Sequence, residues 1–296
     1  MSKYFEGFEQ MQIDVGGVTI NVLKGGTGAP MLMLHGHPET HLMWHKVAPR
    51  LAEEYTLILP DLRGYGESSH PKGLSDHSNY SKRTMAADQV KVMQALGYDE
   101  FYLVGHDRGA RVSHRMLLDY PGRVKKCVIL DILPTYDMYM STNKRFATSH
   151  YHWFFLIQPP ELPERLLSGD PAYFFRSQFG EFSDPQESAR IFSDDIKNEY
   201  IRLLSTPEGL HSICEDYRAG ATIDLEHDAA DRDKIIQTPI MVLWGQEGNV
   251  GKQFEPLSAW RERASNVTGF GIPNCAHFIP EDAPEATWNA IREFMR

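Results

Sequence analysis

The feature that most constrains this chain is an alternation of short apolar runs with longer segments of helical spacing. The apolar runs read MLML, YTLIL, FYLV, CVIL and IMVLW, and they occupy Met31–Leu34, Tyr55–Leu59, Phe101–Val104, Cys127–Leu130 and Ile240–Trp244. Short continuous runs without polar alternation are typical of strands that are buried on both faces of a parallel sheet. The alternation therefore predicts a doubly wound, mostly parallel α/β sheet.

Local signals add further elements to this sheet. The segment MQIDVGGVTINVLKGG predicts a hairpin in which Gly16-Gly17 is the two-residue turn. VTGFGI predicts a last strand, and TMAADQVKVMQALG predicts a helix that ends near Gly97, because Met85 and Leu96 belong to a set of apolar residues near helical spacing.

The regular alternation stops between Asp131 and Ile240. The intervening residues are rich in aromatic, proline and acidic residues and have helical patterns such as YHWFFL and SARIFSDDIKNEYIRLL. An insertion at this point of such a sheet usually covers the carboxyl ends of the strands, where ligands bind. We expect a core formed by residues 1–134 and 233–296 and a helical cap formed by residues 135–232.

Composition excludes several classes of protein. The chain has 296 residues and a formal net charge of −10, which argues against non-specific binding to nucleic acid or to an anionic membrane surface. Its three cysteines, Cys127, Cys214 and Cys275, are too few for a disulfide framework or a cysteine-rich metal site. No apolar stretch reaches transmembrane length. We therefore expect a cytoplasmic protein with a small-molecule partner and no metal.

The strongest motif is Gly105-His106-Asp107-Arg108-Gly109, which follows the FYLV strand and precedes a helical pattern. Small residues two positions before and after a polar residue allow a sharp strand-to-helix turn that projects this side chain. The motif predicts that Asp107 is a nucleophile, although an Asp at this point could instead be the N-cap of the helix.

An Asp nucleophile narrows the chemistry. A carboxylate can displace a leaving group from a saturated carbon and form an ester that water later cleaves. A serine at the same position would form an ether, which water does not readily cleave. Asp107 therefore indicates carbon–halogen or epoxide substrates rather than esters or peptides.

Cleavage of this ester requires a base and an acid that orients it. His277 follows the last predicted strand, and the chain order of nucleophile, acid and histidine is that of the α/β hydrolases. Two acids are candidates from spacing: Asp131 directly follows the CVIL strand, whereas Glu247 lies in the glycine-rich turn after the IMVLW strand.

The HGHP turn after the MLML strand is a candidate oxyanion site. The backbone N–H of His37 would be one donor and that of Arg108 the other. A less favoured alternative is a metal site formed by His35, His37, His41 and His45, but no cysteine or carboxylate cluster completes it.

Arg108 and Arg111 lie in the first turn of the helix that begins at Asp107. Cations at a helix N-terminus oppose its dipole, so a guanidinium pair there suggests that an anion completes the site. The functional interpretation is that both bind a substrate carboxylate, and the structural alternative is that they form salt bridges to Asp119 or to acids of the cap.

The predicted cap contains three candidate donors to a departing halide, namely His152, Trp153 and Tyr217. Imidazole, indole and phenol groups can all donate hydrogen bonds. The alternative is that HYHWFF simply forms the interior of the cap.

GHDRGARVSHR, LDILPTY, YHWFF, CEDYRAGA and the final His together resemble the fluoroacetate dehalogenases of the α/β-hydrolase superfamily. The resemblance covers nearly the whole chain and implies the α/β-hydrolase fold with an inserted helical cap. It favours Asp131 over Glu247, and it implies a homodimer without a cofactor. It implies roles for eight residues: Asp107, His277 and Asp131 in catalysis, Arg108 and Arg111 as carboxylate ligands, and His152, Trp153 and Tyr217 around the halide.

One departure concerns the pocket wall, where His37 stands in place of the usual phenylalanine of the HGFP motif. We expect the backbone donor to remain and the wall to become more polar. The expected activity is hydrolytic dehalogenation of small 2-haloacetates, including fluoroacetate. The alternatives are an epoxide hydrolase with the same Asp and His, and a non-catalytic small-molecule receptor on the same fold.

Overall fold

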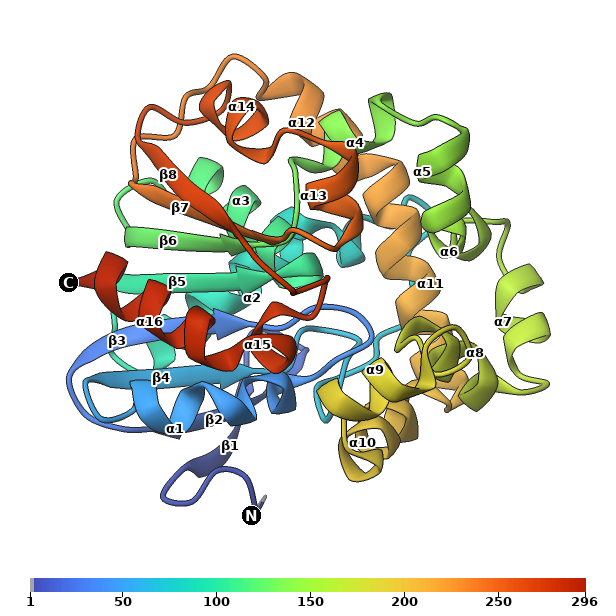
Figure 1. Cartoon of the computed structure of the whole chain (residues 1–296), viewed down its shortest axis with the longest axis horizontal. Coiled ribbons are helices and arrows are strands. Elements are labelled where there is room, and N and C mark those ends of the chain that lie inside the picture. The colour runs from blue at the N-terminus through green and yellow to red at the C-terminus, as the bar shows by residue number, and fades with distance from the viewer. Residues whose placement is uncertain (1–2) are drawn as a thin grey trace.

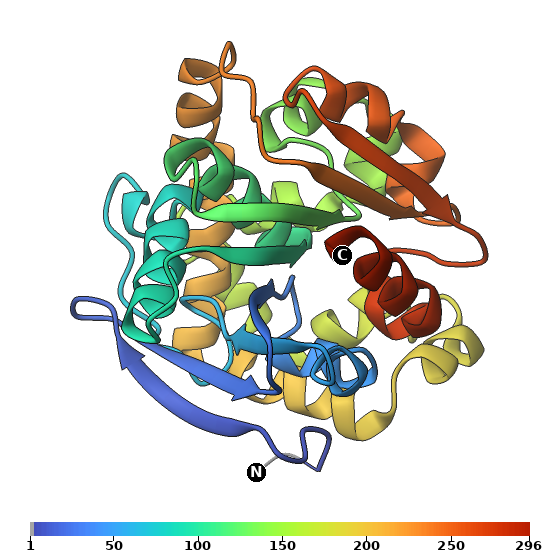
Figure 2. The same ribbon diagram turned by 90° about the vertical axis from the view of Figure 1, so that its left-hand side faces the viewer.

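The computed structural model describes residues 3–296, and within them eight strands form one sheet (Figures 1 and 2). Strands β3 to β8 are parallel, whereas β1 and β2 are antiparallel to their neighbours. The spatial order is β1-β2-β4-β3-β5-β6-β7-β8. Their bounds are β1 (Glu9–Asp14), β2 (Thr19–Gly25), β3 (Ala29–Leu34), β4 (Tyr55–Pro60), β5 (Phe101–His106), β6 (Val124–Leu130), β7 (Ile240–Gly245) and β8 (Val267–Ile272). The predicted mostly parallel sheet is confirmed.

The N-terminal hairpin is also confirmed. The Val15 N–H donates to the Val18 carbonyl over 2.9 Å, which closes a turn around Gly16 and Gly17. Both glycines have positive φ angles, of 104° and 86°. These conformations carry little cost only for residues without a Cβ atom, so the glycine pair determines the turn.

Helices cover both faces of the sheet. Helices α2 and α3 pack against each other on one face, with α3 against β5, and α1 and α16 lie on the opposite face (Figures 1 and 2). The core helices and short 3-10 turns are η1 (His41–Lys46), α1 (Ala48–Leu51), η2 (Ser78–Tyr80), α2 (Lys82–Ala95), α3 (Asp107–Asp119), α13 (Asn249–Gln253), α14 (Pro256–Arg261), α15 (Ile279–Asp282) and α16 (Pro284–Met295). This burial on both faces is why the central strands lack polar alternation.

Helices α4 to α12 all lie between β6 and β7 in sequence, and most of them gather beyond one end of the strands (Figure 1). They are α4 (Thr135–Met140), α5 (Lys144–Ser149), α6 (Tyr151–Leu156), α7 (Leu162–Leu167), α8 (Pro171–Gln178), α9 (Pro185–Ile191), α10 (Asp194–Leu204), α11 (Pro207–Ala221) and α12 (Ile223–Ala230). Their range falls inside the segment 135–232 that we expect to form the cap. Over residues 3–296, the structure contains no helix that is both long and apolar enough to cross a membrane.

Candidate active site

The turn between β5 and α3 places Asp107 at the centre of the candidate site. Asp107 has a φ of 43° and is 6% exposed. A Cβ atom on Gly109 would lie 2.4 Å from the Leu34 carbonyl oxygen, so the helix can approach β3 only because this residue is glycine. The N-cap position is His106 rather than Asp107. The local geometry is therefore the strained turn that the motif predicts, and the N-cap alternative is wrong.

The two carboxylate oxygens of Asp107 have different surroundings. Oδ1 accepts the backbone N–H of His37 over 3.0 Å, whereas Oδ2 lies 3.9 Å from Nε2 of His277. Burial by itself raises the pKa of Asp107, but the His277 imidazole and the charges of Arg111 and Arg108 outweigh it and hold this pKa well below its ordinary value. Asp107 is therefore ionised at neutral pH, as a nucleophile must be.

Asp131 orients His277. Nδ1 of His277 donates to Oδ2 of Asp131 over 2.6 Å, and the Gly245 N–H donates to the other oxygen over 3.0 Å. Glu247, which spacing also allowed, is 58% exposed and pairs with Lys252. Of the two candidates, Asp131 is the acid that contacts His277.

A cavity of about 230 Å³ lies between the carboxyl ends of the strands and the inserted helices. At about 30 Å³ per water molecule, its volume suits a small substrate. It brings together Asp107, Arg111, Asp131 and His277 from the core with the three predicted halide donors. The full lining is His37, Pro38, Asp107, Arg111, Asp131, Met138, Ser149, His150, Tyr151, His152, Trp153, Ser177, Gln178, Tyr217, Asn249, Val250, His277 and Phe278.

Arg111 is the arginine that lines this cavity. Its guanidinium lies over the Trp153 ring, 4.7 Å from the centroid, and one terminal nitrogen donates to Thr135 over 2.9 Å. Its Nε is buried and has no hydrogen-bond partner within residues 3–296. Burial lowers the pKa of Arg111, while Asp107 acts in the opposite direction. This partly unsatisfied cation is suited to bind an anion.

Arg108 has a different environment. It does not belong to the cavity lining, and its Nε donates to Asp216 over 2.7 Å. Its guanidinium stacks on Tyr217, 4.2 Å from the ring centroid. Burial opposes its charge, but Asp216 raises the pKa of Arg108 well above its ordinary value. The structure thus places Arg108 behind Tyr217, and its contact with substrate stays a prediction.

His37 contributes more than its backbone. Its Nε2 donates to Oε1 of Gln178 over 2.9 Å, which joins the HGHP turn to helix α8. Burial lowers the pKa of His37 and of His150 to about 4 and lowers that of His152 well below its ordinary value. These three rings in the cavity wall are therefore neutral at pH 7 and can act as hydrogen-bonding groups.

The alternative metal site is not assembled. His35 contacts the Leu62 N–H, His41 pairs with Asp61, and His45 contacts the Leu42 carbonyl. No group of three or more His, Cys, Asp or Glu side chains within residues 3–296 is arranged to hold a metal ion.

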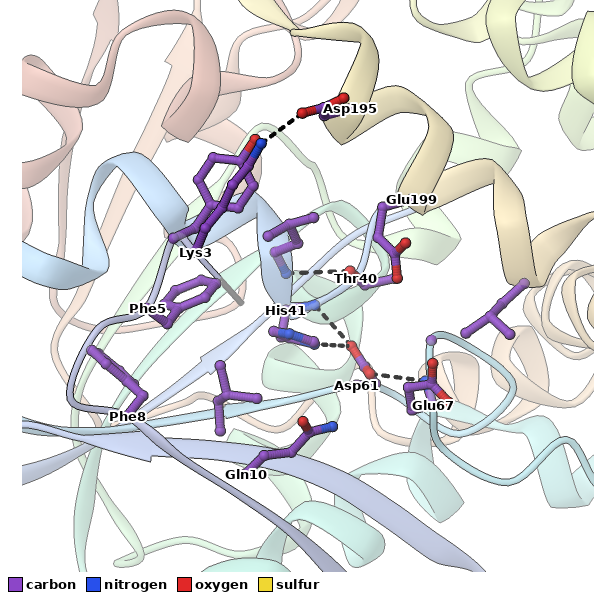
Figure 3. A pocket seen from close by; sticks show the side chains of 15 residues that line it. Lys3, Phe5, Phe8, Gln10, Thr40, His41, Asp61, Glu67, Asp195 and Glu199 are labelled. Atoms are coloured by element: carbon purple, nitrogen blue, oxygen red, sulfur yellow. Dashed lines mark hydrogen bonds and ion pairs between the residues drawn. The ribbon is translucent and has the colours of Figure 1, made fainter. Parts of the chain in front are cut away.

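A second cavity, of about 400 Å³, lies between the N-terminal segment and helix α10 (Figure 3). Its wall includes the His41–Asp61 pair and the Lys3–Asp195 ion pair. None of the residues predicted for catalysis, carboxylate binding or halide binding lines it. Its greater volume therefore does not make it the candidate active site.

Sequence reasoning did not find Asp216 and Gln178. Both come from inserted helices, and each contacts a core residue more than a hundred positions earlier in the chain. Asp216 directly precedes Tyr217, so the quoted motif CEDYRAGA contained it, but its role as a counter-ion had no local signal. Gln178 lies in a helix without any feature that distinguishes it.

Comparison with known proteins gives concordant results. A family model described as the alpha/beta hydrolase fold matches residues 29–284. The chain is 43% identical over 291 residues to a fluoroacetate dehalogenase from Burkholderia sp, covering 98% of this chain and 95% of that protein. It is 34% identical to a soluble epoxide hydrolase from Corynebacterium sp., covering 96% of each chain.

The solved structure of ALR0039 from Nostoc sp PCC 7120 superposes with a TM-score of 0.93 at 52% identity, covering 97% of this chain and 98% of that one. The observed fold, the family model and the related proteins all indicate the same family over almost the whole length of the chain. The chain therefore belongs to the α/β-hydrolase family, within which it is a hydrolase similar to the fluoroacetate dehalogenases.

Proposed function

We propose that this hydrolase cleaves the carbon–halogen bond of small 2-haloacetates, fluoroacetate included, and releases glycolate and halide. The observation that carries the proposal is Arg111, a buried cation in the wall of the Asp107 cavity whose Nε lacks a protein partner within residues 3–296. A substrate carboxylate would satisfy this guanidinium and would lie beside the nucleophile. Similarity to the Burkholderia fluoroacetate dehalogenase supports the same substrate class.

In the first step, Oδ2 of Asp107 attacks the α-carbon of the substrate. The new carbon–oxygen bond forms as the carbon–halogen bond breaks, and the bonding electrons leave with the halide. The other oxygen, Oδ1, keeps its hydrogen bond from the His37 N–H. In this proposal Arg111 binds the substrate carboxylate, Arg108 assists through its position behind Tyr217, and the product of the step is an aspartyl ester.

The halide is expected to leave toward His152, Trp153 and Tyr217, which line the cavity together. Because fluoride is small and strongly hydrated, it needs hydrogen-bond donors more than the larger halides do. Burial raises the pKa of Tyr217 well above its ordinary value, so its phenol keeps its proton. That proton makes Tyr217 a donor at neutral pH.

In the second step, His277 takes a proton from a water molecule, and the resulting hydroxide attacks the carbonyl carbon of the ester. Asp131 stabilises the imidazolium that forms, through its 2.6 Å contact with Nδ1. The tetrahedral oxyanion lies where Oδ1 receives the His37 N–H, with the Arg108 N–H as the proposed second donor. Collapse of this intermediate breaks the bond between the ester carbonyl carbon and the glycolate oxygen. The leaving oxygen takes the proton from His277, which frees glycolate and the base, and Asp107 returns to its carboxylate by releasing its own proton to solvent.

The test measures halide and covalent adduct separately. Wild-type protein should release fluoride from fluoroacetate and chloride from chloroacetate. Asp107→Asn should do neither, and His277→Gln should accumulate a carboxymethyl adduct on Asp107 that intact-mass analysis detects. Failure of His277→Gln to form an adduct, although it binds chloroacetate, would contradict the mechanism.

Epoxide hydrolysis is the second candidate, because the Corynebacterium relative carries that name and the same nucleophile and base would serve it. An epoxide hydrolase needs acids that protonate the epoxide oxygen, and Tyr217 is one candidate in the cavity wall. Diol formation from a simple epoxide, with no halide release from haloacetates, would favour this alternative.

The proposed assembly is a homodimer. Several large apolar side chains of the inserted helices are exposed, including Met140 at 59%, Leu166 at 62% and Tyr173 at 59%. Tyr173 stacks on Phe182, which is also exposed, with ring centroids 4.4 Å apart, and contiguous exposed apolar surface is typical of an interface. Light scattering during gel filtration should give twice the monomer mass.

We also propose a cytoplasmic location. Cys127, Cys214 and Cys275 are all buried and unpaired, which suits a reducing compartment. Cell fractionation with a tagged chain would test this location.

A further inference from the structure

His106, which directly precedes Asp107, is fully buried and binds two acceptors. Its Nδ1 lies 2.9 Å from Oε2 of Glu39, and its Nε2 lies 2.9 Å from the carbonyl oxygen of His277. A carboxylate and a carbonyl can only accept hydrogen bonds, so each ring nitrogen must carry a proton. Two protons make the ring an imidazolium. Burial by itself lowers the pKa of His106, but Glu39 outweighs it and raises this pKa to about 9.

The carboxyl groups of Glu39 and Glu281 form a buried pair next to this ring. Oε2 of Glu39 binds His106, and Oε1 of Glu281 accepts the Tyr200 hydroxyl over 3.0 Å. The remaining oxygens, Oε1 of Glu39 and Oε2 of Glu281, are buried and have no hydrogen-bond partner within residues 3–296. The two groups are within hydrogen-bonding reach of each other.

Two adjacent buried carboxylates cannot both be ionised, so they share one proton. Burial, together with the charge of Glu39, raises the pKa of Glu281 well above its ordinary value. Glu281 is therefore the member of the pair that holds the proton. Oε2 of Glu39 accepts the Nδ1 proton of His106, and this contact raises the pKa of the ring.

This imidazolium lies against the proposed base. The ring centroids of His106 and His277 are 4.7 Å apart. Adding a proton to His277 would place two cations in contact, which is unfavourable. Asp131 and Asp107 lie on the other side of the balance, as carboxylates 2.6 Å from Nδ1 and 3.9 Å from Nε2 of His277.

Other ionisable groups face the same region. Arg111 and His150 lie on the cavity side, and His45, Lys46, Tyr200 and Asp282 lie around the carboxyl pair. Burial lowers the pKa of His150 and of His45 to about 4, so neither adds a charge near neutral pH. Among these groups, His106 is the cation whose ring contacts that of His277.

We propose that His106, held as an imidazolium by the Glu39–Glu281 pair, is a positioning residue that keeps His277 unprotonated and fixes its loop. The proposal rests on the proposed function in one respect, namely that His277 is the base for cleavage of the Asp107 ester. His106 itself does not touch the substrate. Its positive charge offsets the negative charges of the two aspartates that lie beside the His277 ring.

The test follows the pH dependence of ester hydrolysis. Enzyme in excess over chloroacetate is mixed with it, so that each Asp107 forms the ester at most once; samples are quenched at intervals, and the decay of the Asp107 adduct is followed by intact mass from pH 5 to pH 10. In His106→Gln, loss of the cation should move the acid limb of this rate about 1–2 pH units higher. Glu39→Gln should move it in the same direction, because the ring loses the anion that holds its second proton.

Glu281→Gln is the matched control, since an amide can donate to Glu39 and accept from Tyr200 as the protonated acid does. It should leave the acid limb within about 0.3 pH units of wild type, a margin well below the shift that a nearby charge causes. Lower rates in His106→Gln and Glu39→Gln with no movement of the limb would reduce these residues to a structural role and overturn the proposal. A shift in Glu281→Gln without one in Glu39→Gln would overturn the assignment of the shared proton.

A spectroscopic measurement separates this inference from the proposed function. Nitrogen-15 shifts of the His106 ring, assigned by their absence in His106→Gln, should report two protonated nitrogens in the wild-type protein from pH 6 to about pH 9. A neutral ring at pH 7 would overturn the proposal even if dehalogenation occurs. An imidazolium in a protein that releases no halide would leave this electrostatic assignment intact and contradict only the proposed function.

Discussion

Replacing Asp216 by Asn tests what the counter-ion of Arg108 contributes. Asp216 is completely buried and receives the Arg108 Nε, the Lys82 ammonium and the Tyr65 hydroxyl. The amide of the asparagine carries no charge, and its NH2 group replaces one of the two accepting oxygens. This NH2 group would then face the Arg108, Lys82 and Tyr65 groups, which are themselves hydrogen-bond donors. Arg108 and Lys82 are only 1% and 4% exposed, and for Lys82 a second carboxylate, that of Asp224, lies 3.6 Å away.

Breaking a buried pair by removing one partner costs about 3–5 kcal/mol. For a chain of this size, about 2 °C is lost per kcal/mol, so the melting temperature should fall by about 6–10 °C. Asp99→Asn is the matched control. Its pair with Arg123 has the same 2.7 Å distance, but Asp99 is 87% exposed, so its loss should cost at most about 1 kcal/mol.

The difference between wild type and Asp216→Asn should also depend on pH. Burial opposes ionisation of Asp216, but Arg108 and Lys82 outweigh it and hold the pKa of this carboxyl below its ordinary value of 3.8. Because the pKa is lower in the folded state than in the unfolded state, the stabilisation is complete above about pH 5. It is lost as the pH falls through the folded-state value.

Urea unfolding at pH 7, 5 and 3 measures this dependence. The wild-type advantage over Asp216→Asn should be equal at pH 7 and pH 5 and smaller at pH 3. If Asp216→Asn and Asp99→Asn lose equally small amounts of unfolding free energy at pH 7, this would refute the reasoning that burial determines how much stability is lost when an ion pair is broken.

Two further predictions concern the elbow and the cavity wall. Gly109→Ala should prevent folding or lower the melting temperature by more than 10 °C, because its Cβ would lie 2.4 Å from the Leu34 carbonyl oxygen. In the control Gly169→Ala, the new Cβ meets nothing closer than 3.6 Å, so this variant should melt close to wild type. Similar melting curves for the two variants would contradict the packing argument. Arg111→Met should lower kcat/KM for chloroacetate about 30- to 1,000-fold, the equivalent of about 2–4 kcal/mol for a buried charged hydrogen bond. The loss of kcat/KM should be much smaller for chloroacetamide, which is neutral. Equal losses for both substrates would argue against carboxylate binding by Arg111.

The sequence by itself determined the sheet, the hairpin and the elbow, because each has a local physical cause. Uniformly apolar runs must be buried on both faces, and Gly16-Gly17 permits a turn that other residues resist. Gly109 allows α3 to approach the end of β3 and thereby places Asp107. The resemblance then named eight residues, and all of them except Arg108 line one cavity.

The tertiary structure decided which side chains contact one another across long distances in the chain. Spacing left both Asp131 and Glu247 open, and folding brings Asp131 to His277 and leaves Glu247 in solvent. Arg108 and Arg111 also look equivalent along helix α3. In the structure, however, Arg108 donates to Asp216 of α11, whereas Arg111 lines the cavity. The carboxyl pair of Glu39 and Glu281 had no sequence signal at all, because its protonation follows from burial and proximity, which exist only after the chain has folded.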